Sequence, residues 1–218
     1  MKAFSLFFFF ILVTNYALGD EFEDSEKVKS QILSFVEVLK KEGVDTIFTY
    51  QSNAIGYDRV IDVPAGASEN EVDSLFCESK EPGYVFWVSK NKGYCKKFHP
   101  CVEFDTAAFS ALALLTFLNS TPGLLAGAPL KPFQMKQKGE IHSVIVDHSE
   151  RTKVWFKIGR LEKCTVIDSF SLLKSQFGAP VPNLNYASNR KKPFFLLSRL
   201  LGSIIEKTVF PRVRMVKS

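Results

Sequence analysis

The first nineteen residues have the layout of a secretory signal peptide. Lys2 supplies a positive charge, residues 3–18 form an apolar run, and Ala17 and Gly19 give the small-x-small pattern of a cleavage site. The run is short for a transmembrane helix, which needs about 20 apolar residues, and a signal anchor is the alternative. The sequence therefore predicts a chain that enters the secretory pathway, where cysteines can be oxidised.

Cleavage of this peptide, residues 1–19, leaves a chain of single-domain size. Residues 20–218 carry enough apolar side chains for one core, because the chain is 46% hydrophobic and 23% charged, as ordinary globular proteins are. No later apolar run is long enough to cross a membrane, so we expect no transmembrane span. We predict a globular domain over residues 20–188 and a separate basic amphipathic segment over residues 189–218.

The net charge of +5 is concentrated near the C-terminus. The segment 189–218 holds one acidic residue, Glu206, against eight basic residues: Arg190, Lys191, Lys192, Arg199, Lys207, Arg212, Arg214 and Lys217. This asymmetry predicts an anionic surface or an acidic protein as partner, and the alternative is that the segment docks on the mildly acidic body. The secretory route argues against nucleic acid as a partner.

Residue spacing predicts a mixture of helices and strands. Apolar residues at helical spacing predict a helix over residues 25–42, and a capping box at Ser68 and Glu71 predicts one over 68–76. A run that is apolar almost all round predicts a buried helix over residues 106–118, and a short helix is expected over 169–177. Alternating or aromatic-rich runs predict strands over residues 45–50, 57–63, 84–89, 94–98, 140–148, 152–159 and 163–167. Turn residues suggest two hairpins, one joined at residues 91–93 and one formed by 140–148 with 152–159. Because strands and helices do not alternate steadily, we expect an α+β fold with an antiparallel sheet packed with helices.

The four cysteines form an even set. In a secreted chain Cys77, Cys95, Cys101 and Cys164 predict two disulfides, for which three connectivities are open. Cys95 and Cys101 flank a proline-containing loop and are one candidate pair, which leaves Cys77 for Cys164. The alternative is a zinc site of Cys95, His99 and Cys101, with Cys77 as fourth ligand. Its spacing matches no standard zinc finger, and we expect no metal and no other cofactor.

Cys101 and His142 support an alternative, catalytic hypothesis. Cys101 precedes the helix predicted from residue 106, and a helix N-terminus lowers the pKa of a thiol. His142 begins a later strand, from which an imidazole can act as base. Papain-like hydrolases place a cysteine and a histidine in this order on these kinds of element. The analogy concerns chain order and geometry and not a sequence motif. His148 lies about 20 Å along the same strand from His142, too far to share a metal ion.

The C-terminal segment also contains a clear amphipathic helix. Pro193 suits its first turn, and Pro211 ends the pattern. One side of this helix carries Leu200, Leu201, Ile204, Ile205 and Val209. Such a helix can lie on an anionic membrane with its apolar side in the interface, and the alternative is that the stripe covers the core of the domain.

Asn119 begins the sequon Asn119-Ser120-Thr121 in a predicted loop, which predicts a glycoprotein. Taken together, these patterns predict a secreted, disulfide-bonded protein that binds without catalysis. Its basic C-terminal helix would contact an anionic membrane surface or an acidic partner. The alternative function is a secreted papain-like cysteine hydrolase that uses Cys101 and His142.

Overall fold

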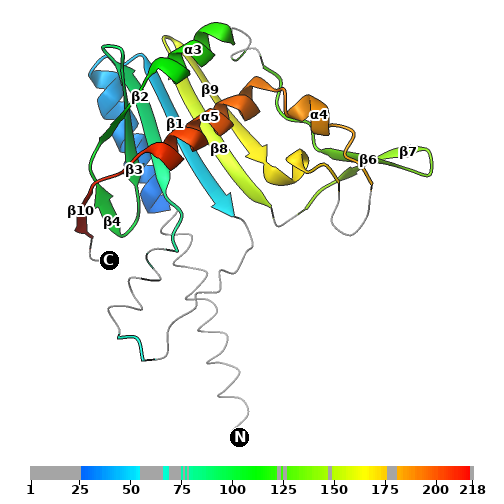
Figure 1. Cartoon of the computed structure of the whole chain (residues 1–218), viewed down its shortest axis with the longest axis horizontal. Helices are drawn as coiled ribbons and strands as arrows, with labels where there is room; N and C mark the ends of the chain where they lie inside the picture. Colours follow the sequence, from blue (N-terminus) through cyan, green and yellow to red (C-terminus); the bar gives the residue numbers. More distant parts are fainter. Residues whose placement is uncertain are drawn as a thin grey trace, which may run out of the picture.

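A six-stranded antiparallel sheet with helices on both faces is the centre of the computed structural model (Figure 1). The structure describes residues 26–54, 66–68, 75, 77, 79–121, 124, 127–146, 149–175 and 181–216. In the strand order β5-β3-β2-β1-β8-β9, the bounds are β5 (Ala107–Phe109), β3 (Lys92–Phe98), β2 (Gly83–Ser89), β1 (Thr46–Ala54), β8 (Glu150–Ile158) and β9 (Leu161–Asp168). The predicted α+β class is confirmed.

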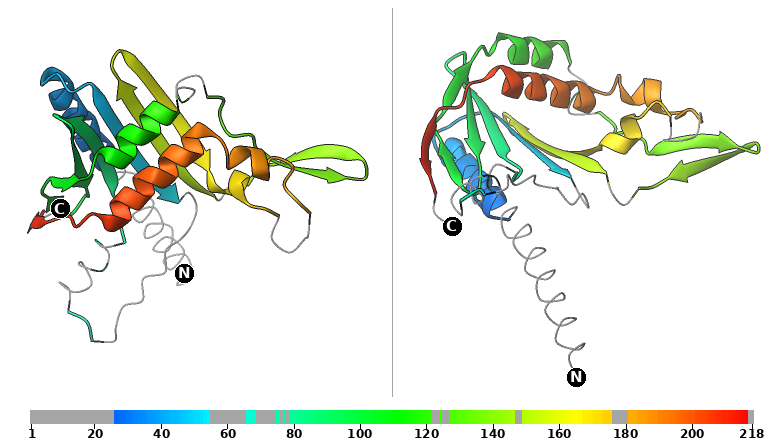
Figure 2. Two further views of the ribbon diagram at one scale, coloured as in Figure 1. Left: turned by 45° about the horizontal axis from the view of Figure 1, so that its top comes forward. Right: turned by 60° about the horizontal axis from the view of Figure 1, so that its bottom comes forward.

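Two small sheets and several helices surround the central sheet. One small sheet pairs β4 (Val102–Phe104) with β10 (Arg212–Met215), and the other pairs β6 (Phe133–Gln137) with β7 (Glu140–Val144). The helices are residues 26–41, here called the N-terminal helix, and α3 (Leu112–Ser120), η2 (Ser169–Leu172), α4 (Tyr186–Asn189) and α5 (Pro193–Lys207). The β6–β7 hairpin projects from one end of the molecule, away from β4 and β10 (Figures 1 and 2).

The alternation of side chains along each strand creates two separate cores. Ile47, Val85 and Trp87 point to the face that the N-terminal helix covers, where Val28, Ile32, Val36 and Leu39 are buried. Their neighbours Phe48 and Phe86 point to the opposite face and pack beneath α3 and α5. The two helical layers lie on opposite sides of the sheet in Figure 2. The sheet is therefore buried on both faces.

The helix α5 is an integral part of the second core. It begins at Pro193, as predicted, and its buried side chains are Phe194, Leu197, Leu201 and Ile204. Full burial of a leucine side chain contributes about 1.5–3 kcal/mol.

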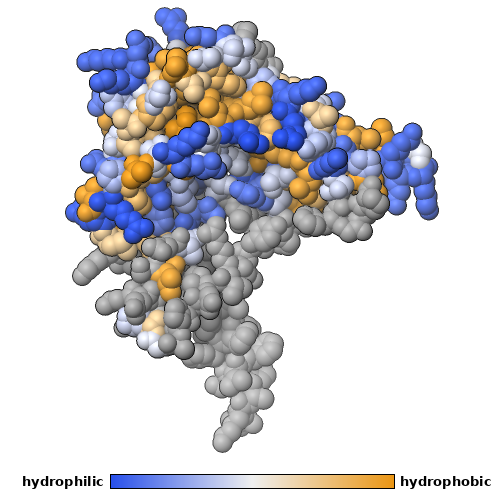
Figure 3. Space-filling model, viewed as in Figure 1, coloured by the Kyte–Doolittle hydropathy of each residue, from blue (hydrophilic) through white to orange (hydrophobic). Residues whose placement is uncertain are grey.

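Of the predicted stripe, Leu201 and Ile204 are buried, and Leu200 and Ile205 pack partly buried against the same core. Val209 was wrongly included, because α5 ends at Lys207 and Val209 is 86% exposed. The rest of the stripe covers the sheet, which is the docked alternative of the sequence analysis. Hydrophobic residues remain visible among hydrophilic ones over α3 and α5 in Figure 3. Exposed leucines on these two helices are Leu112 and Leu196.

The predicted hairpin of residues 140–148 with 152–159 is wrong. The strand β7 pairs instead with β6 through a turn at Lys138 and Gly139, both with positive φ, and β8 pairs with β1 and β9. Residues 119–139 are rich in proline and glycine, a composition that predicts a loop and not the strand β6. Alternation identifies a strand, but it does not specify which strand lies beside it.

The predicted helix over residues 106–118 begins later than expected. Its first part is β5, which pairs with β3 and sets Ala107 opposite Cys95, and the helix α3 starts at Leu112.

The β2–β3 turn is formed by Lys90 and Asn91, both with positive φ, one residue earlier than predicted. The predicted helix over residues 169–177 is observed as the short η2, where the Asp168 carboxylate accepts a hydrogen bond from the N–H of Phe170. The predicted signal peptide, the strand over residues 57–63 and most of the helix over 68–76 lie outside the described residues.

Three buried asparagines hold the base of the projecting hairpin. Asn189 accepts a hydrogen bond from the N–H of Lys131 at 3.0 Å and donates to the carbonyl of the same residue at 2.8 Å. Asn183 accepts a hydrogen bond from the N–H of Gln134, and Asn185 donates one to the carbonyl of Pro132. These side chains satisfy backbone groups that no strand partner reaches. The hairpin is therefore anchored by side-chain amides at its base.

Candidate ligand-binding pocket

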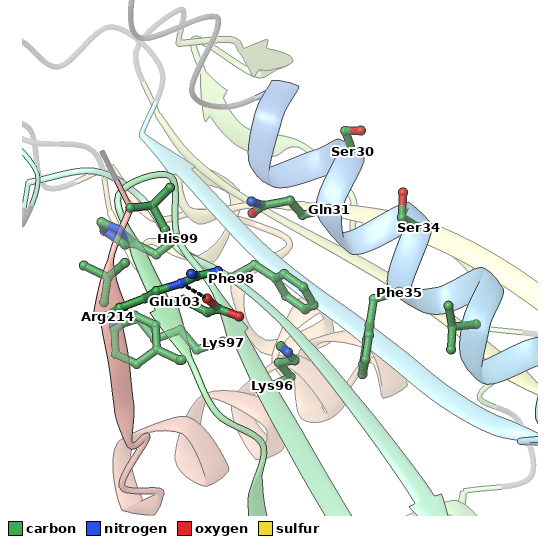
Figure 4. A pocket seen from close by; sticks show the side chains of 14 residues that line it. Ser30, Gln31, Ser34, Phe35, Lys96, Lys97, Phe98, His99, Glu103 and Arg214 are labelled. Carbon is green, nitrogen blue, oxygen red and sulfur yellow. Dashed lines mark hydrogen bonds and ion pairs between the residues drawn. The ribbon is translucent and has the colours of Figure 1, made fainter. Parts of the chain in front are cut away.

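A pocket of about 600 Å³ lies between the N-terminal helix, the end of β3 and the small β4–β10 sheet (Figure 4). The three elements meet here because β3 leads through a short turn into β4, and β10 returns to pair with β4. Ligand pockets for small molecules commonly have volumes of about 300–1,000 Å³. The cavity is thus large enough for a small organic molecule.

Lys96 extends along an aromatic wall of this pocket. The rings of Phe35 and Phe98 lie 5.5 Å apart, one from the N-terminal helix and one from β3. The Lys96 ammonium is 5.4 Å from the centroid of Phe35 and 5.9 Å from that of Phe98. A cation over aromatic faces is attracted by the negative charge density of the rings. The two rings therefore hold a positive charge at the wall of the cavity.

A second ammonium belongs to Lys97. Its Nζ lies 4.4 Å from the centroid of Phe104 on β4. Burial, and then the positive charge of Arg212, lower the pKa of Lys97. The register of the β4–β10 pair places Arg212 opposite Phe104, which explains why the two cations are neighbours. An anion in this region would relieve the repulsion between them.

Arg214 adds a third cation to the pocket lining, and Glu103 is its partner. The Arg214 Nε donates to Oε2 of Glu103 at 2.6 Å, and the two residues are paired in the β4–β10 register. Their side chains are 73% and 40% exposed. Ion pairs at such exposure contribute about 0–1 kcal/mol, so an incoming anion can compete for the guanidinium. The lining thus combines three cations with one carboxylate.

Polar side chains of the N-terminal helix complete the wall opposite the cations. Ser30, Gln31 and Ser34 line the pocket, and Figure 4 shows Gln31 extending from the helix toward the space beside β3. Hydroxyl and amide groups both donate and accept hydrogen bonds. Of the three, Gln31 is the side chain that extends toward the cations, so its amide can orient a bound molecule without adding charge.

The structure separates the basic residues that the sequence groups together. Arg212 and Arg214 lie on β10 beside the pocket, whereas Arg190, Lys191 and Lys192 precede α5. A helix of fifteen residues, as α5 is, spans about 22 Å, so these two groups flank opposite ends of α5. Arg199 and Lys207 are exposed on α5, and Lys217 lies outside the described residues. The seven of these charges that the structure describes do not form one patch, and among those seven only Arg212 and Arg214 join Lys96 and Lys97.

Cys101 and His142 are not brought together. Cys101 lies in the turn between β3 and β4, while His142 is exposed on β7 in the projecting hairpin (Figures 1 and 2). His142 instead has Glu140 as a neighbour, 3.9 Å from Nε2 to the carboxylate. Cys101 is also followed by a strand and not by a helix N-terminus. The geometric basis of the hydrolase hypothesis is therefore lost. His148 lies outside the described residues.

The four cysteines are thiols in this structure and occupy three different environments. Cys95 is fully buried in the core beneath α5, and burial raises the pKa of its thiol. Cys164 is exposed on β9, separated from Cys95 by β2, β1 and β8. Cys77 instead packs beside Cys101 in a small cluster with Val102 and Phe104. Of the predicted zinc ligands, Cys77, His99 and Cys101 converge, and Cys95 does not join them.

The sequon residue Asn119 lies in the last turn of α3 and not in a loop. Its side chain is exposed, so a glycan there would extend into solvent. Glycosylation at this position stays a prediction.

The sequence pattern does not single out Lys96 and Lys97, because the aromatic-rich run of β3 predicts a strand and nothing more. Two consecutive lysines stand directly before Phe98 in this aromatic-rich strand. Lysine is not favoured in strands, so this pair is the sequence feature that could have indicated a binding role.

Comparisons with known proteins gave no match, whether against family models, curated proteins or solved structures. Among the described residues, no helix is long and apolar enough to cross a membrane. The pocket and its side chains therefore carry the functional argument.

Proposed function

We propose that this protein is a secreted binding protein that takes a small organic anion into the pocket between the N-terminal helix, β3 and β10. The observation that carries the proposal is the convergence of Lys96, Lys97 and Arg214 on a cavity with aromatic walls. Clefts lined by one sign of charge concentrate oppositely charged ligands. The aromatic rings beside those charges offer an apolar surface to the rest of the ligand.

The side chains define the class of ligand. A carboxylate, sulfonate or phosphate group would lie between the lysines and Arg214, because Arg and Lys donate charge-assisted hydrogen bonds to such groups. An apolar or aromatic body would pack on Phe35 and Phe98. The ligand expected is therefore amphipathic, with one anionic end.

This proposal revises the role of the basic C-terminal segment. Its helix α5 has its apolar stripe in the core, which leaves β10 as the part that reaches an anionic ligand through Arg214. The secretory location rests on the N-terminal apolar run of the sequence, and the glycan remains a prediction. The predicted pair of disulfides is not part of this proposal, because β2, β1 and β8 separate Cys95 from Cys164. Binding is favoured over catalysis because the cations and the Gln31 amide of the pocket are groups that hold an anion.

The proposal can be tested with 8-anilinonaphthalene-1-sulfonate, an aromatic anion whose fluorescence rises on binding. Titration of the full chain should give saturable binding that weakens with salt, because salt screens charges. The double variant Lys96→Gln and Arg214→Gln should bind at least about tenfold more weakly, since a hydrogen bond to a charged group contributes about 1.5–3 kcal/mol. Circular dichroism would verify that the variant is folded.

The matched control is Lys136→Gln with Lys153→Gln, which removes the same charge from exposed positions on β6 and β8. This control should bind the probe as the unmodified chain does. Equal weakening in both double variants would mean that net charge and not the pocket attracts the probe. Equally tight binding of the uncharged analogue N-phenyl-1-naphthylamine would also contradict an anion site.

A further inference from the structure

Three metal-ligating side chains converge behind the pocket wall. Cys77 precedes β2 in the chain, while His99 and Cys101 flank Pro100 in the turn from β3 to β4. The Sγ of Cys77 lies 4.0 Å from Nδ1 of His99, and the three ligand atoms are all within 4.8 Å of one another. In a tetrahedral zinc site, bonds of about 2.0–2.3 Å place ligand atoms about 3.5–3.8 Å apart. Shifts of about 1 Å or less would therefore close these side chains around an ion.

We propose that Cys77, His99 and Cys101 form a binding site for Zn²⁺. Two thiolates and one imidazole are a soft donor set that suits this ion. The fourth position of a tetrahedral site would be taken by a water molecule. The site is separate from the anion proposal, since it uses different atoms and needs no organic ligand.

The orientation of the His99 ring supports the proposal. The backbone N–H of Cys101 points at Nδ1 of His99 at 3.3 Å, and an N–H group only donates. The Nδ1 atom is therefore the acceptor nitrogen of the ring, and its lone pair is available on an atom that lies 4.0 Å from Sγ of Cys77 and within 4.8 Å of Sγ of Cys101. A zinc ion would replace this long hydrogen bond.

The turn that carries two of the ligands is fixed at both ends. Phe98 ends β3 within the central sheet, and Val102 begins β4. The carbonyl of Cys101 also accepts a hydrogen bond from the N–H of Val216 at 2.6 Å. A metal site needs ligands held in place by their surroundings. Here the strands on either side of Pro100 supply that support.

Burial and charge make the ion the favourable partner for this cluster. Cys77 and His99 are 5% and 6% exposed, and Val102 and Phe104 pack against Cys77. A buried thiolate at Cys77 beside a partly buried one at Cys101 is costly without a cation, whereas two thiolates with Zn²⁺ have no net charge. An apolar shell also strengthens the attraction between ion and ligands. Because His99 lines the pocket, the ion would fix one edge of that cavity.

The test uses the full chain, secreted by cultured cells and purified without reductant or chelator. Elemental analysis should find one zinc ion per chain. After zinc removal, Co²⁺ should give the thiolate charge-transfer band and the intense visible bands of tetrahedral cobalt. Cys77→Ser, Cys101→Ser and His99→Gln should each weaken metal binding at least about tenfold, while Cys164→Ser, on the exposed face of β9, should leave it unchanged.

A second measurement does not depend on whether the variants fold. In the unmodified protein, a zinc chelator should speed the alkylation of Cys77 and Cys101 and leave the rate at Cys164 unchanged. A Cys77–Cys101 disulfide in the secreted protein would overturn the proposal, because those sulfurs would no longer be thiolates. Reduced cysteines without stoichiometric zinc and without the cobalt bands would overturn it as well. Either result would leave Lys96, Lys97 and Arg214 in the pocket lining, so the zinc proposal can fail while the binding of the fluorescent anion that depends on Lys96 and Arg214 persists.

Discussion

Cys95 and Cys164 show how position on a strand sets the chemistry of one residue type. Cys95 points into the core beneath α5, while Cys164 lies on the edge strand β9 and is exposed. Burial raises the pKa of Cys95, because the uncharged thiol is favoured where water is excluded. The thiolate is the form that reacts with alkylating agents. The same side chain is therefore protected in one strand and reactive in another.

We predict that iodoacetamide at mildly alkaline pH modifies Cys164 in the native protein and leaves Cys95 unmodified. The raised pKa of Cys95 keeps its thiol protonated as the pH rises, and its burial also blocks the reagent. Peptide mass spectrometry after timed labelling measures both rates. Cys95 should react only after the chain is unfolded in urea. Native labelling of Cys95 at the rate of Cys164 would contradict the described packing.

The chemistry of single residues could be predicted from the sequence only in part. His99 and Cys101 are close in the chain, so their proximity was visible. Cys77 reaches them through the packing of a distant segment, and Cys95 is directed away by the alternation of β3. Residue spacing reports local neighbours, whereas a site assembled across elements depends on the tertiary fold.

Among the elements, α5 provides the clearest link between sequence pattern and packing. Its periodicity places Leu197 and Leu201 on one side, and both are fully buried against the sheet. Leu196 lies on the other side and is 42% exposed. The helix thus carries a buried leucine and an exposed leucine that can be compared directly.

We predict that Leu201→Ala lowers the free energy of unfolding by about 2–5 kcal/mol, because it leaves a cavity in the core. The matched control Leu196→Ala should change it by about 0.5 kcal/mol or less, as surface substitutions usually do. Urea unfolding followed by circular dichroism gives both values. Similar losses in the two variants would show that α5 does not pack on the sheet through its predicted stripe.

The existence of α5 could be predicted, but its environment could not. A helix that covers a core and one that lies on a membrane have the same apolar periodicity. The strand β7 illustrates the same limit, because alternation defined the strand and β6 was hidden among prolines and glycines. Which strands pair with each other depends on the tertiary fold of the whole chain and not on the pattern within one strand.

For the molecule as a whole, the C-terminal segment is part of the fold and not an appendage. Truncation after Ser188 would remove α5 and expose the core residues Phe48 and Phe156. We predict that this shortened chain loses its cooperative thermal transition in circular dichroism.

Truncation after Val209 keeps α5 and removes β10, so it should retain the transition and bind the sulfonate probe about tenfold more weakly, because Arg214 is lost.

These two truncations separate a structural role from a binding role. If the chain that ends at Ser188 melted like the full chain, α5 would not be needed for the core. If the chain that ends at Val209 bound the probe at full strength, β10 would not belong to the pocket. The pattern of eight basic residues predicted one functional segment, but the structure divides it between a core helix and a pocket strand.

The order of strands in the central sheet has a kinetic consequence. The hairpins β2–β3 and β8–β9 each join segments that are adjacent in the chain, whereas β1 pairs with β8 across the middle of the sequence. Closing such a long loop costs conformational entropy before any contact is gained. We therefore expect the two hairpins to form early and the junction of β1 with β8 to form late. Until it closes, the aromatic side chains of both halves stay open to water and to other newly made chains.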